Sequence, residues 1–120
     1  MVLEQRLYLA ELFDIYGPLL TDKQQKCLGM HLLEDFSMSE IGEELAVSRQ
    51  AVYDILHRSE QIMSDYEEKL GLAKRLKTQQ QELAGLYDEI SRLSSLDEER
   101  IEHILMKLAP YAGKVQEELD

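Results

Sequence analysis

The sequence predicts an all-α protein, and three observations lead to this fold class. Apolar residues recur three and four positions apart along almost the whole chain, which is the spacing of an amphipathic helix. Only six glycines and two prolines interrupt the 120 residues. Nowhere does the alternation of apolar and polar residues that is typical of a half-buried strand persist. We therefore expect a bundle of helices over residues 1–70 and a helical C-terminal segment over residues 71–120.

The bundle begins with two predicted helices that are separated by a Gly-Pro pair. The first covers about residues 3–16 and ends at Gly17-Pro18. The second is expected to start after Thr21, because Thr21 and Gln24 have the spacing of a capping box, and to close at residues 35–36. The predicted apolar faces are Leu7, Ala10, Leu12, Phe13 and Tyr16 in the first helix, and Cys27, Leu28 and Leu32 in the second.

Two further helices follow, each marked at its start by a serine. Ser37 and Glu40 form a second capping box, which opens a short third helix. Ser48 is expected to cap a long fourth helix that continues to about Leu70. The residues expected to be buried are Ile41 and Leu45 in the third helix, and Val52, Ile55, Leu56, Ile62, Met63 and Tyr66 in the fourth.

Residues 37–58 match the frame of a helix-turn-helix motif, in which two helices cross through a short turn. Gly42 is the small residue at the close approach of the helices, and Val47 and Val52 fill the wedge between them. Ala46 occupies the turn position that is usually glycine, where a left-handed backbone costs an alanine about 1 kcal/mol. With Ser48 as cap, the residues expected to face outward are Arg49, Gln50, Tyr53, Asp54 and His57.

These motifs carry a family resemblance. From Thr21 to about Glu60 the chain resembles region 4 of bacterial sigma factors, which recognises promoter DNA. The matching segments are a T-x-x-Q-Q opening, an S-x-S-E-I-G-E-x-L helix and a V-S-R-Q-A-V-Y recognition helix. An acidic chain of this size, with helices that lead into L-T-x-K-Q and a helical C-terminal segment, also resembles the YlxM family of helix-turn-helix proteins over nearly all 120 residues.

The YlxM resemblance implies a bacterial regulatory protein whose gene commonly lies beside those of the signal recognition particle GTPases. A regulatory or accessory role in that protein-targeting pathway follows from this gene neighbourhood and not from the chemistry of the residues. The implied partners are DNA or RNA and components of the signal recognition particle. The alternative is a protein-interaction module, or an RNA-binding accessory factor of that particle, which uses the helix-turn-helix as a scaffold and binds no DNA.

Charge limits the nucleic-acid hypothesis. The chain has 13 Lys plus Arg against 24 Asp plus Glu, a formal net charge of −11. This acidity excludes polybasic binding to nucleic acid or to a membrane surface, because both depend on cations that neutralise phosphates. Residues 1–66 hold 5 cations against 12 acids, and residues 37–58 contain only Arg49 and Arg58 as permanent cations. Binding by a single chain is therefore expected to be weak, and a homodimer would double the contacts.

A local excess of positive charge lies between residues 69 and 77, where the fourth helix gives way to the C-terminal segment. A solvated helix face is one interpretation of this cluster, and a phosphate contact near the recognition helix is the other. Together with the helix-turn-helix, it completes the candidate nucleic-acid-binding set. This set comprises Ser48, Arg49, Gln50, Tyr53, His57, Arg58, Lys69, Lys74, Arg75 and Lys77.

The C-terminal segment contains a heptad seam with two interpretations. One is a coiled coil that joins two chains as a homodimer, with Gln79 fixing the register. The other is an intramolecular hairpin, in which a last helix, capped by Ser95 and Glu98 and broken by Pro110, folds back on the seam. The seam comprises Leu72, Leu76, Gln79, Leu83, Leu86, Ile90 and Leu93, and the returning residues are Leu96, Ile101, Ile104, Leu105 and Leu108.

The sequence favours a non-enzymatic protein without cofactor or metal. His31, His57 and His103 fall on different predicted helices and have no convergent partners, and no phosphate-binding loop or zinc-type cluster is present. Cys27 stands alone, which predicts a buried thiol in a reducing compartment. No segment is long and apolar enough to cross a bilayer, and the first residues lack the charge order of a signal peptide. We therefore expect a cytoplasmic protein.

Overall fold

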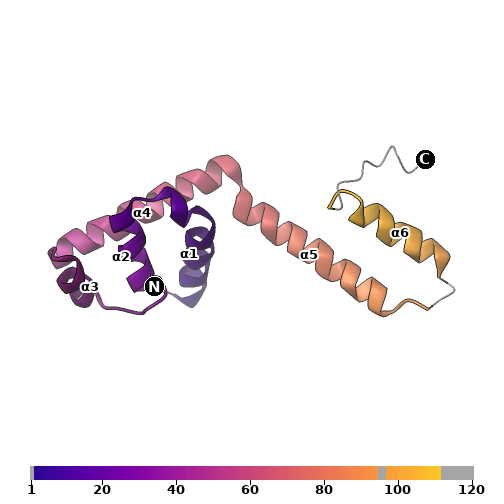
Figure 1. Cartoon of the computed structure of the whole chain (residues 1–120), viewed down its shortest axis with the longest axis horizontal. Helices are drawn as coiled ribbons and strands as arrows, with labels where there is room; N and C mark the ends of the chain where they lie inside the picture. Colours follow the sequence, from indigo (N-terminus) through magenta and orange to yellow (C-terminus); the bar gives the residue numbers. More distant parts are fainter. Residues whose placement is uncertain (1, 95–96, 112–120) are drawn as a thin grey trace. The chain divides into compact units, whose positions relative to one another are not determined.

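A computed structural model describes residues 2–94 and 97–111 of the chain. These residues form six α-helices and one 3-10 helix and contain no strand, so the predicted all-α fold class is confirmed. The chain divides into two compact units, Met1–Arg75 and Leu76–Asp120. The elements labelled in Figure 1 are α1 (Leu3–Tyr16), α2 (Asp22–Leu32), α3 (Met38–Leu45), α4 (Arg49–Leu70), α5 (Leu72–Ser91) and α6 (Glu98–Leu108), with the 3-10 helix Gly17–Leu19 after α1.

The first unit is built around α4, which packs against each of α1, α2 and α3 (Figure 1). Cys27 is fully buried in this core, as predicted, and burial raises the pKa of its thiol. Apart from Leu20, every residue of the buried cluster was predicted from the sequence to lie on an apolar helix face. The buried cluster comprises Leu12, Tyr16, Leu20, Cys27, Leu28, Leu32, Ile41, Val52, Leu56 and Met63.

Both predicted capping boxes are present, and they fix where α2 and α3 begin. The Thr21 side chain accepts a hydrogen bond from the Gln24 amide at 3.2 Å, and the Gln24 side chain accepts one from the Thr21 amide at 3.0 Å. Ser37 and Glu40 make the same reciprocal pair at 3.1 and 3.0 Å. Each box satisfies two backbone donors that a helix start otherwise leaves without a partner.

One residue of the predicted apolar face of α1 is not buried. Leu12 and Tyr16 enter the core, whereas Leu7 is 56% exposed. The reason is helical geometry, since Leu7 precedes Tyr16 by nine residues and so lies about 180° from it around the helix axis. The buried stripe of α1 instead includes Leu9, which packs partly against the core. Leu7 lies on a second apolar stripe that points away from the core.

Gly71 separates α4 from α5, at the composition change seen in the sequence. Its backbone is left-handed, with φ of 62°, and its amide donates to the Glu67 carbonyl at 2.8 Å. The Glu67 carboxylate then accepts hydrogen bonds from the Ala73 and Lys74 amides at 2.9 and 3.2 Å. The first turn of α5 is therefore fixed to the end of α4 and belongs to the first unit, so the two units divide after Arg75 and not at Gly71.

In the second unit α6 folds back along α5. Leu86 and Ile104 are 2% and 4% exposed, and the Glu89 carboxylate lies 3.4 Å from His103 Nδ1 and 3.5 Å from Lys107 Nζ. The Tyr111 hydroxyl also hydrogen-bonds to Glu82. Of the two interpretations of the seam, the structure therefore contains the intramolecular hairpin.

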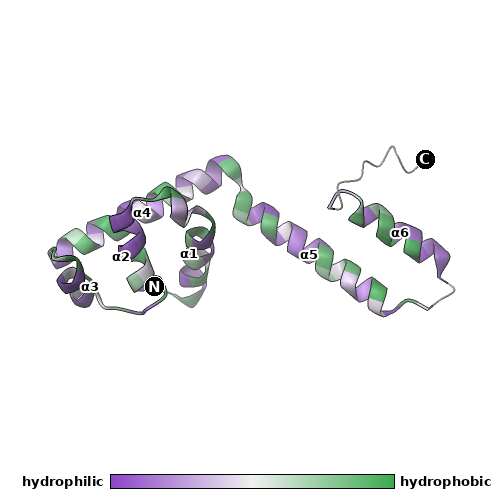
Figure 2. Cartoon of the chain, in the orientation of Figure 1, coloured by the Kyte–Doolittle hydropathy of each residue, from purple (hydrophilic) through white to green (hydrophobic). Residues whose placement is uncertain are grey.

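The hairpin buries fewer residues than the sequence predicts. Among those seam and returning residues that the structure describes, only Leu86 and Ile104 are buried. The helix α6 begins at Glu98, with Asp97 in the cap position, and the predicted cap residue Ser95 cannot be compared with it. Ser95 and Leu96 lie outside the described residues. Hydrophobic residues, green in Figure 2, recur along both ribbons. Several of their large side chains remain exposed: Leu76, Leu83, Tyr87 and Ile90 on α5, and Ile101, Leu105 and Met106 on α6.

No helix within residues 2–94 and 97–111 has the length and apolar character that crossing a bilayer requires.

Candidate nucleic-acid interface

The turn between α3 and α4 adopts the left-handed conformation that the sequence predicts. Ala46 has φ of 56° and ψ of 44°, and the Val47 amide donates to the Gly42 carbonyl at 2.9 Å. An L-residue other than glycine in this conformation costs about 1 kcal/mol, because its Cβ approaches the backbone carbonyl oxygen. Ala46 bears this cost at the point where the chain must reverse to start α4.

Gly42 allows α3 to approach the turn closely. A Cβ atom built on Gly42 would lie 2.9 Å from the Val47 carbonyl oxygen, a distance that real Cβ atoms essentially never show. The same Cβ would lie 3.6 Å from Val52 and 3.7 Å from the Arg49 amide, which are ordinary contacts. Gly42 therefore has to be small, as predicted, but the atom that requires it is a carbonyl of the turn and not an atom of α4.

The helix α4 begins with a side-chain cap and presents its first two turns to solvent. The Ser48 hydroxyl accepts a hydrogen bond from the Ala51 amide at 3.0 Å, as predicted. Val52, on the opposite face of α4, is fully buried and orients the helix. The residues predicted to face outward are all exposed in the structure: Arg49, Gln50, Tyr53, Asp54 and His57.

Two side-chain contacts order the exposed face of α4. The Gln50 amide donates to the Asp54 carboxylate at 3.1 Å, one helical turn further along. The Tyr53 and His57 rings are nearly parallel, with 2° between their planes and 6.5 Å between their centroids. These contacts hold two hydrogen-bonding groups and an aromatic face toward solvent at spacings of three and four residues. A surface of this kind suits the edges of bases in a major groove.

A cationic groove beside α4 was missed in the sequence. Arg58 and Asp54 on α4 line a hollow together with Thr21, Lys23 and Gln24 from the start of α2. The capping box explained why α2 begins at Asp22 but gave no sign of what lies next to it. The groove therefore adds the Lys23 ammonium to the two arginines of the helix-turn-helix.

Within the first unit, the basic residues from position 69 onward lie apart from this surface. Lys69 lies in the last turn of α4, about 30 Å along the helix axis from Arg49. Lys74 and Arg75 belong to the start of α5. Lys77, the last residue of the predicted basic cluster, belongs to the second unit.

The electrostatic surroundings of the α4 surface are mixed. Glu40, Glu43 and Glu44 of α3 are all exposed, and Asp54 lies between the two arginines on α4. The opposing cations are few, so the field that would attract a phosphate backbone is weak. Any affinity of this surface for nucleic acid has to come from a small number of well-placed contacts.

The histidines outside the α4 surface lie on separate helices. Among residues 2–94 and 97–111, no group of three or more His, Cys, Asp and Glu side chains is arranged to hold a metal ion. His31 and His103 lie on α2 and α6. Burial, followed by the Arg6 charge, lowers the pKa of His31 below its usual value. Arg6 donates to the His31 carbonyl at 2.8 Å, which is a structural contact between α1 and α2.

The left-handed turn, the close approach at Gly42 and the capped, exposed α4 together define a helix-turn-helix protein. Comparison with known families agrees with this class. Residues 3–106 match the family UPF0122, which is described as "Putative helix-turn-helix protein, YlxM / p13 like". The chain belongs to this family.

Curated members of the family are similar over most of their length. A UPF0122 protein of Geobacillus kaustophilus is 42% identical over 98 residues, which cover 82% of this chain and 89% of the relative. The UPF0122 protein YlxM of Bacillus subtilis is 42% identical over 102 residues, 85% of this chain and 89% of the relative. A UPF0122 protein of Thermoanaerobacter sp. (strain X514) is 41% identical over 113 residues, 92% of this chain and 93% of the relative.

Proposed function

We propose that the protein is a non-enzymatic regulator that binds nucleic acid, in the first place double-stranded DNA, through the first half of α4. The observation that carries this proposal is the capped start of α4 beside a left-handed turn, with Arg49, Gln50, Tyr53 and His57 all exposed on one surface. A major groove admits a helix presented in this way, and the N-terminal residues of the helix reach the base edges.

The side chains divide into two roles under this proposal. Arg49 and Gln50 lie in the first turn of α4 and carry the donors that pair with guanine and adenine edges. Arg58 and Lys23 line the adjacent groove and neutralise phosphates, and the N-terminus of α4 favours a further phosphate near Ser48. Base contacts give the sequence preference, whereas phosphate contacts give the dependence on salt.

A homodimer completes this proposal, because two recognition helices compensate for the small number of cations on each. The α5 residues that face α6, Glu82, Leu86 and Glu89, leave a second stripe of the helix uncovered. This stripe carries Leu83 between Leu76 and Ile90, which are 51% and 50% exposed and lie seven residues to either side. We propose that two copies pair along this stripe through their second units.

In an antiparallel arrangement of the two α5 helices, centred on Leu83, Leu76 of one copy would lie opposite Ile90 of the other. The apolar stripe then meets itself, as a two-fold interface requires.

A second candidate function is supported by the acidity of the first unit. Residues 1–66 hold 5 Lys plus Arg against 12 acids, which weakens any attraction to a phosphate backbone. The protein would then be a cytoplasmic accessory factor of the signal recognition particle, as the YlxM resemblance implies, and would bind the protein or RNA components of that particle. The helix-turn-helix would serve this function as a scaffold.

The two functions are separated by one pair of variants and a matched control. Arg49→Ala with Arg58→Ala removes both permanent cations of the α4 surface. Arg92→Ala with Arg100→Ala removes the same charge from exposed positions in the second unit. Each protein is tested at low ionic strength against fragmented DNA of a bacterium that encodes a family member, and against transcribed signal recognition particle RNA. Bound fragments are sequenced after several rounds of selection.

The DNA function predicts that wild-type protein and the Arg92/Arg100 variant enrich the same short sequence, while the Arg49/Arg58 variant enriches none. Equal enrichment by the Arg49/Arg58 variant would show that these two residues of α4 do not recognise the DNA sequence. Binding of the particle RNA or of a targeting GTPase at high salt, without DNA enrichment, would support the accessory function instead. If wild-type protein retains no nucleic acid of either kind even at low salt, the nucleic-acid proposal is wrong.

A further inference from the structure

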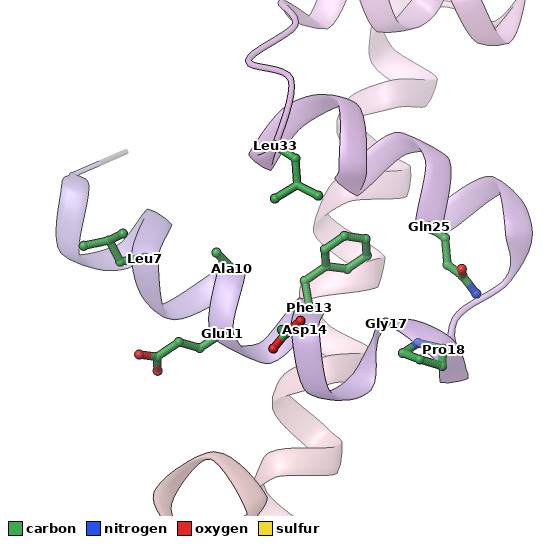
Figure 3. Close-up of a pocket in the computed structure, with 9 residues that line it drawn as sticks. All are labelled: Leu7, Ala10, Glu11, Phe13, Asp14, Gly17, Pro18, Gln25 and Leu33. Carbon is green, nitrogen blue, oxygen red and sulfur yellow. The ribbon is translucent and has the colours of Figure 1, made fainter. Parts of the chain in front are cut away.

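A groove on the first unit has no role in the proposed function. It lies along α1 and the 3-10 helix that follows α1, and it is bordered by Gln25 of α2 and by Leu33, the residue directly after α2 (Figure 3). Figure 3 shows the Phe13 ring projecting from α1 toward α2, with the Leu33 side chain on the α2 side of the opening. The apolar lining consists of Leu7, Ala10, Phe13, Gly17, Pro18 and Leu33.

Two large apolar side chains of the groove are exposed to solvent. Leu7 of α1 and Leu33, directly after α2, are 56% and 70% exposed, although the first unit has a well-filled core. Phe13 lines the groove and packs partly against the core, and a Cβ at Gly17 would lie only 3.1 Å from its ring. Apolar surface of this kind, rimmed by polar groups, is typical of a protein interaction site.

The rim of the groove is acidic. Glu11 and Asp14 both line it, they lie three residues apart on α1, and both are exposed. No lysine or arginine is among the residues that line the groove within the described part of the chain. Two carboxylates three positions apart on one helix are neighbours, about 5–6 Å apart at their Cβ atoms. They form a compact negative edge beside the apolar lining.

The two walls of the groove are fixed relative to each other. The Arg6 guanidinium reaches from α1 to the end of α2, where it donates to the His31 carbonyl at 2.8 Å and pairs with Asp35 at 3.0 Å. The ion pair also neutralises the charge of Arg6, the only lysine or arginine of α1. The groove is therefore formed before any partner binds, which lowers the entropic cost of binding.

The groove and the α4 surface use different residues. The residues that line the groove come from α1, the 3-10 helix, Gln25 of α2 and Leu33 directly after α2, and none comes from α4. The cationic groove beside Arg58 uses Thr21, Lys23 and Gln24 of α2 instead. Substitutions in one surface therefore leave the other intact, and the two can be tested separately.

We propose that the α1–α2 groove binds a basic amphipathic helix of a partner protein. The apolar face of that helix packs on Leu7, Phe13 and Leu33, and Lys or Arg residues on its flank pair with Glu11 and Asp14. This is the helix-in-groove mode of recognition, in which affinity comes from the apolar face and orientation from the charges. The inference does not rest on nucleic-acid binding by α4, and it commits to a protein partner of positive charge.

The test uses the full chain, labelled with ¹⁵N, and a synthetic helix as the probe. The probe is a peptide of about 15 residues made of Leu and Lys, with Leu on one helical face and Lys on the other. A peptide with the same pattern but Glu in place of Lys, and a scrambled Leu/Lys peptide, serve as matched ligands. Backbone amide shifts are followed during titration, and affinity is measured by calorimetry.

The protein variants separate the groove from the overall negative charge. Glu11→Lys with Asp14→Lys reverses the rim, whereas Glu98→Lys with Glu102→Lys makes the same change in net charge on exposed positions of α6. We expect the Leu/Lys peptide to shift amides around Leu7, Phe13 and Leu33. We also expect the rim variant to weaken its binding by about tenfold while the α6 variant leaves it nearly unchanged.

Three results would overturn the proposal. Equal loss of affinity in the rim and α6 variants would show that the peptide responds only to net charge. Amide shifts confined to α5 and α6 would place the binding site elsewhere. Equal affinity for the patterned and the scrambled Leu/Lys peptides would mean that no helical face is recognised. A gain of affinity for the Leu/Glu peptide by the rim variant would support the proposal independently.

Discussion

The Tyr16 hydroxyl donates a hydrogen bond of 2.7 Å to the Glu67 carboxylate, which connects the end of α1 to the end of α4. The same hydroxyl accepts from the Leu72 amide at 3.3 Å, and the same carboxylate accepts from the Ala73 and Lys74 amides. A single ionised side chain therefore satisfies the donors at the start of α5 and the phenol of a buried core residue. Three helices meet at this carboxylate.

We predict that Glu67→Gln lowers the free energy of unfolding of the first unit by about 1–2 kcal/mol, because hydrogen bonds to a charged acceptor are stronger than those to an amide. Burial raises the pKa of Glu67, but the hydrogen bonds from Ala73, Tyr16 and Lys74 outweigh it, and the net pKa lies below the usual value. Chemical denaturation at neutral pH, followed by circular dichroism, measures the difference. The neighbouring, exposed Glu68→Gln is the matched control.

The lowered pKa also fixes the direction of the pH dependence. A carboxyl with a lower pKa in the folded state stabilises the fold above its unfolded-state pKa of about 4.3, and this contribution is lost as the pH falls through the folded-state value. The stability difference between wild type and Glu67→Gln should therefore be largest at neutral pH and shrink in acid. A difference that stays constant from neutral pH to acid would contradict this account.

Replacing Ala46 by glycine should stabilise the protein. The left-handed backbone at φ of 56° costs alanine about 1 kcal/mol, and glycine adopts it without that cost, although its unfolded chain has more entropy to lose. We expect a net gain of about 0.5–1 kcal/mol in urea denaturation. Ala51→Gly, inside the first turns of α4, is the opposing control and should destabilise by about 1 kcal/mol.

Replacing Gly42 by alanine should have the opposite effect. The new methyl group would lie 2.9 Å from the Val47 carbonyl oxygen, which is backbone and cannot rotate away. The turn has to shift, and we expect a loss of about 1–3 kcal/mol together with weaker nucleic-acid binding. Gly29→Ala is the matched control, since nothing lies within 4 Å of its new Cβ and alanine favours a helix. Unchanged stability in Gly42→Ala would mean that α3 and the turn are not closely packed.

The proposed dimer predicts that Leu83→Lys yields monomers. A lysine at the centre of the stripe would face its own copy across the two-fold axis, so that two like charges would meet in an apolar interface. Sedimentation velocity at several concentrations measures the mass. Gln81→Lys adds the same charge about 200° away around α5 and should leave the mass unchanged. If the wild-type protein is monomeric at all concentrations, the proposed dimer is wrong.

Variants that lose a phosphate contact should differ from variants that lose a base contact in how their DNA affinity depends on salt concentration. Once a DNA target is selected, Arg58→Ala or Lys23→Ala should reduce the slope of log affinity against log salt by about 1 and weaken all sequences alike. Arg49→Ala should instead relax the preference at one base pair, at a cost of about 1–3 kcal/mol for the preferred sequence. If both kinds of variant change only the slope, the first turn of α4 makes no base contacts.

Local features of the fold were predictable because their causes are local. A capping box needs two residues three positions apart, so Thr21 and Ser37 could be identified as helix starts without any tertiary information. The left-handed turn at Ala46 followed in the same way from the offsets to Gly42 and Val52. Helix periodicity then identified most of the core, since a helix that packs at all must bury its apolar stripe.

Features that depend on contacts between distant residues were not predictable. No sequence pattern singled out Glu67, because nothing near it in sequence indicates that Tyr16, fifty-one positions earlier, donates to it. Lys23 was missed for the same reason, since its proximity to Arg58 arises from the packing of α2 on α4. In the second unit, periodicity gave the seam but could not determine which stripe faces α6, because an apolar residue fits either surface.

The hydrogen bonds to Glu67 have a practical consequence for anyone who wishes to isolate the helix-turn-helix. A fragment that stops at Leu70, where α4 ends, would lose the Ala73 and Lys74 amides and leave a carboxylate with fewer donors beside a buried tyrosine. A fragment that ends at Arg75 keeps these donors and also retains Ala73, which packs against the core. The smallest autonomous recognition module therefore includes the opening turn of the following helix.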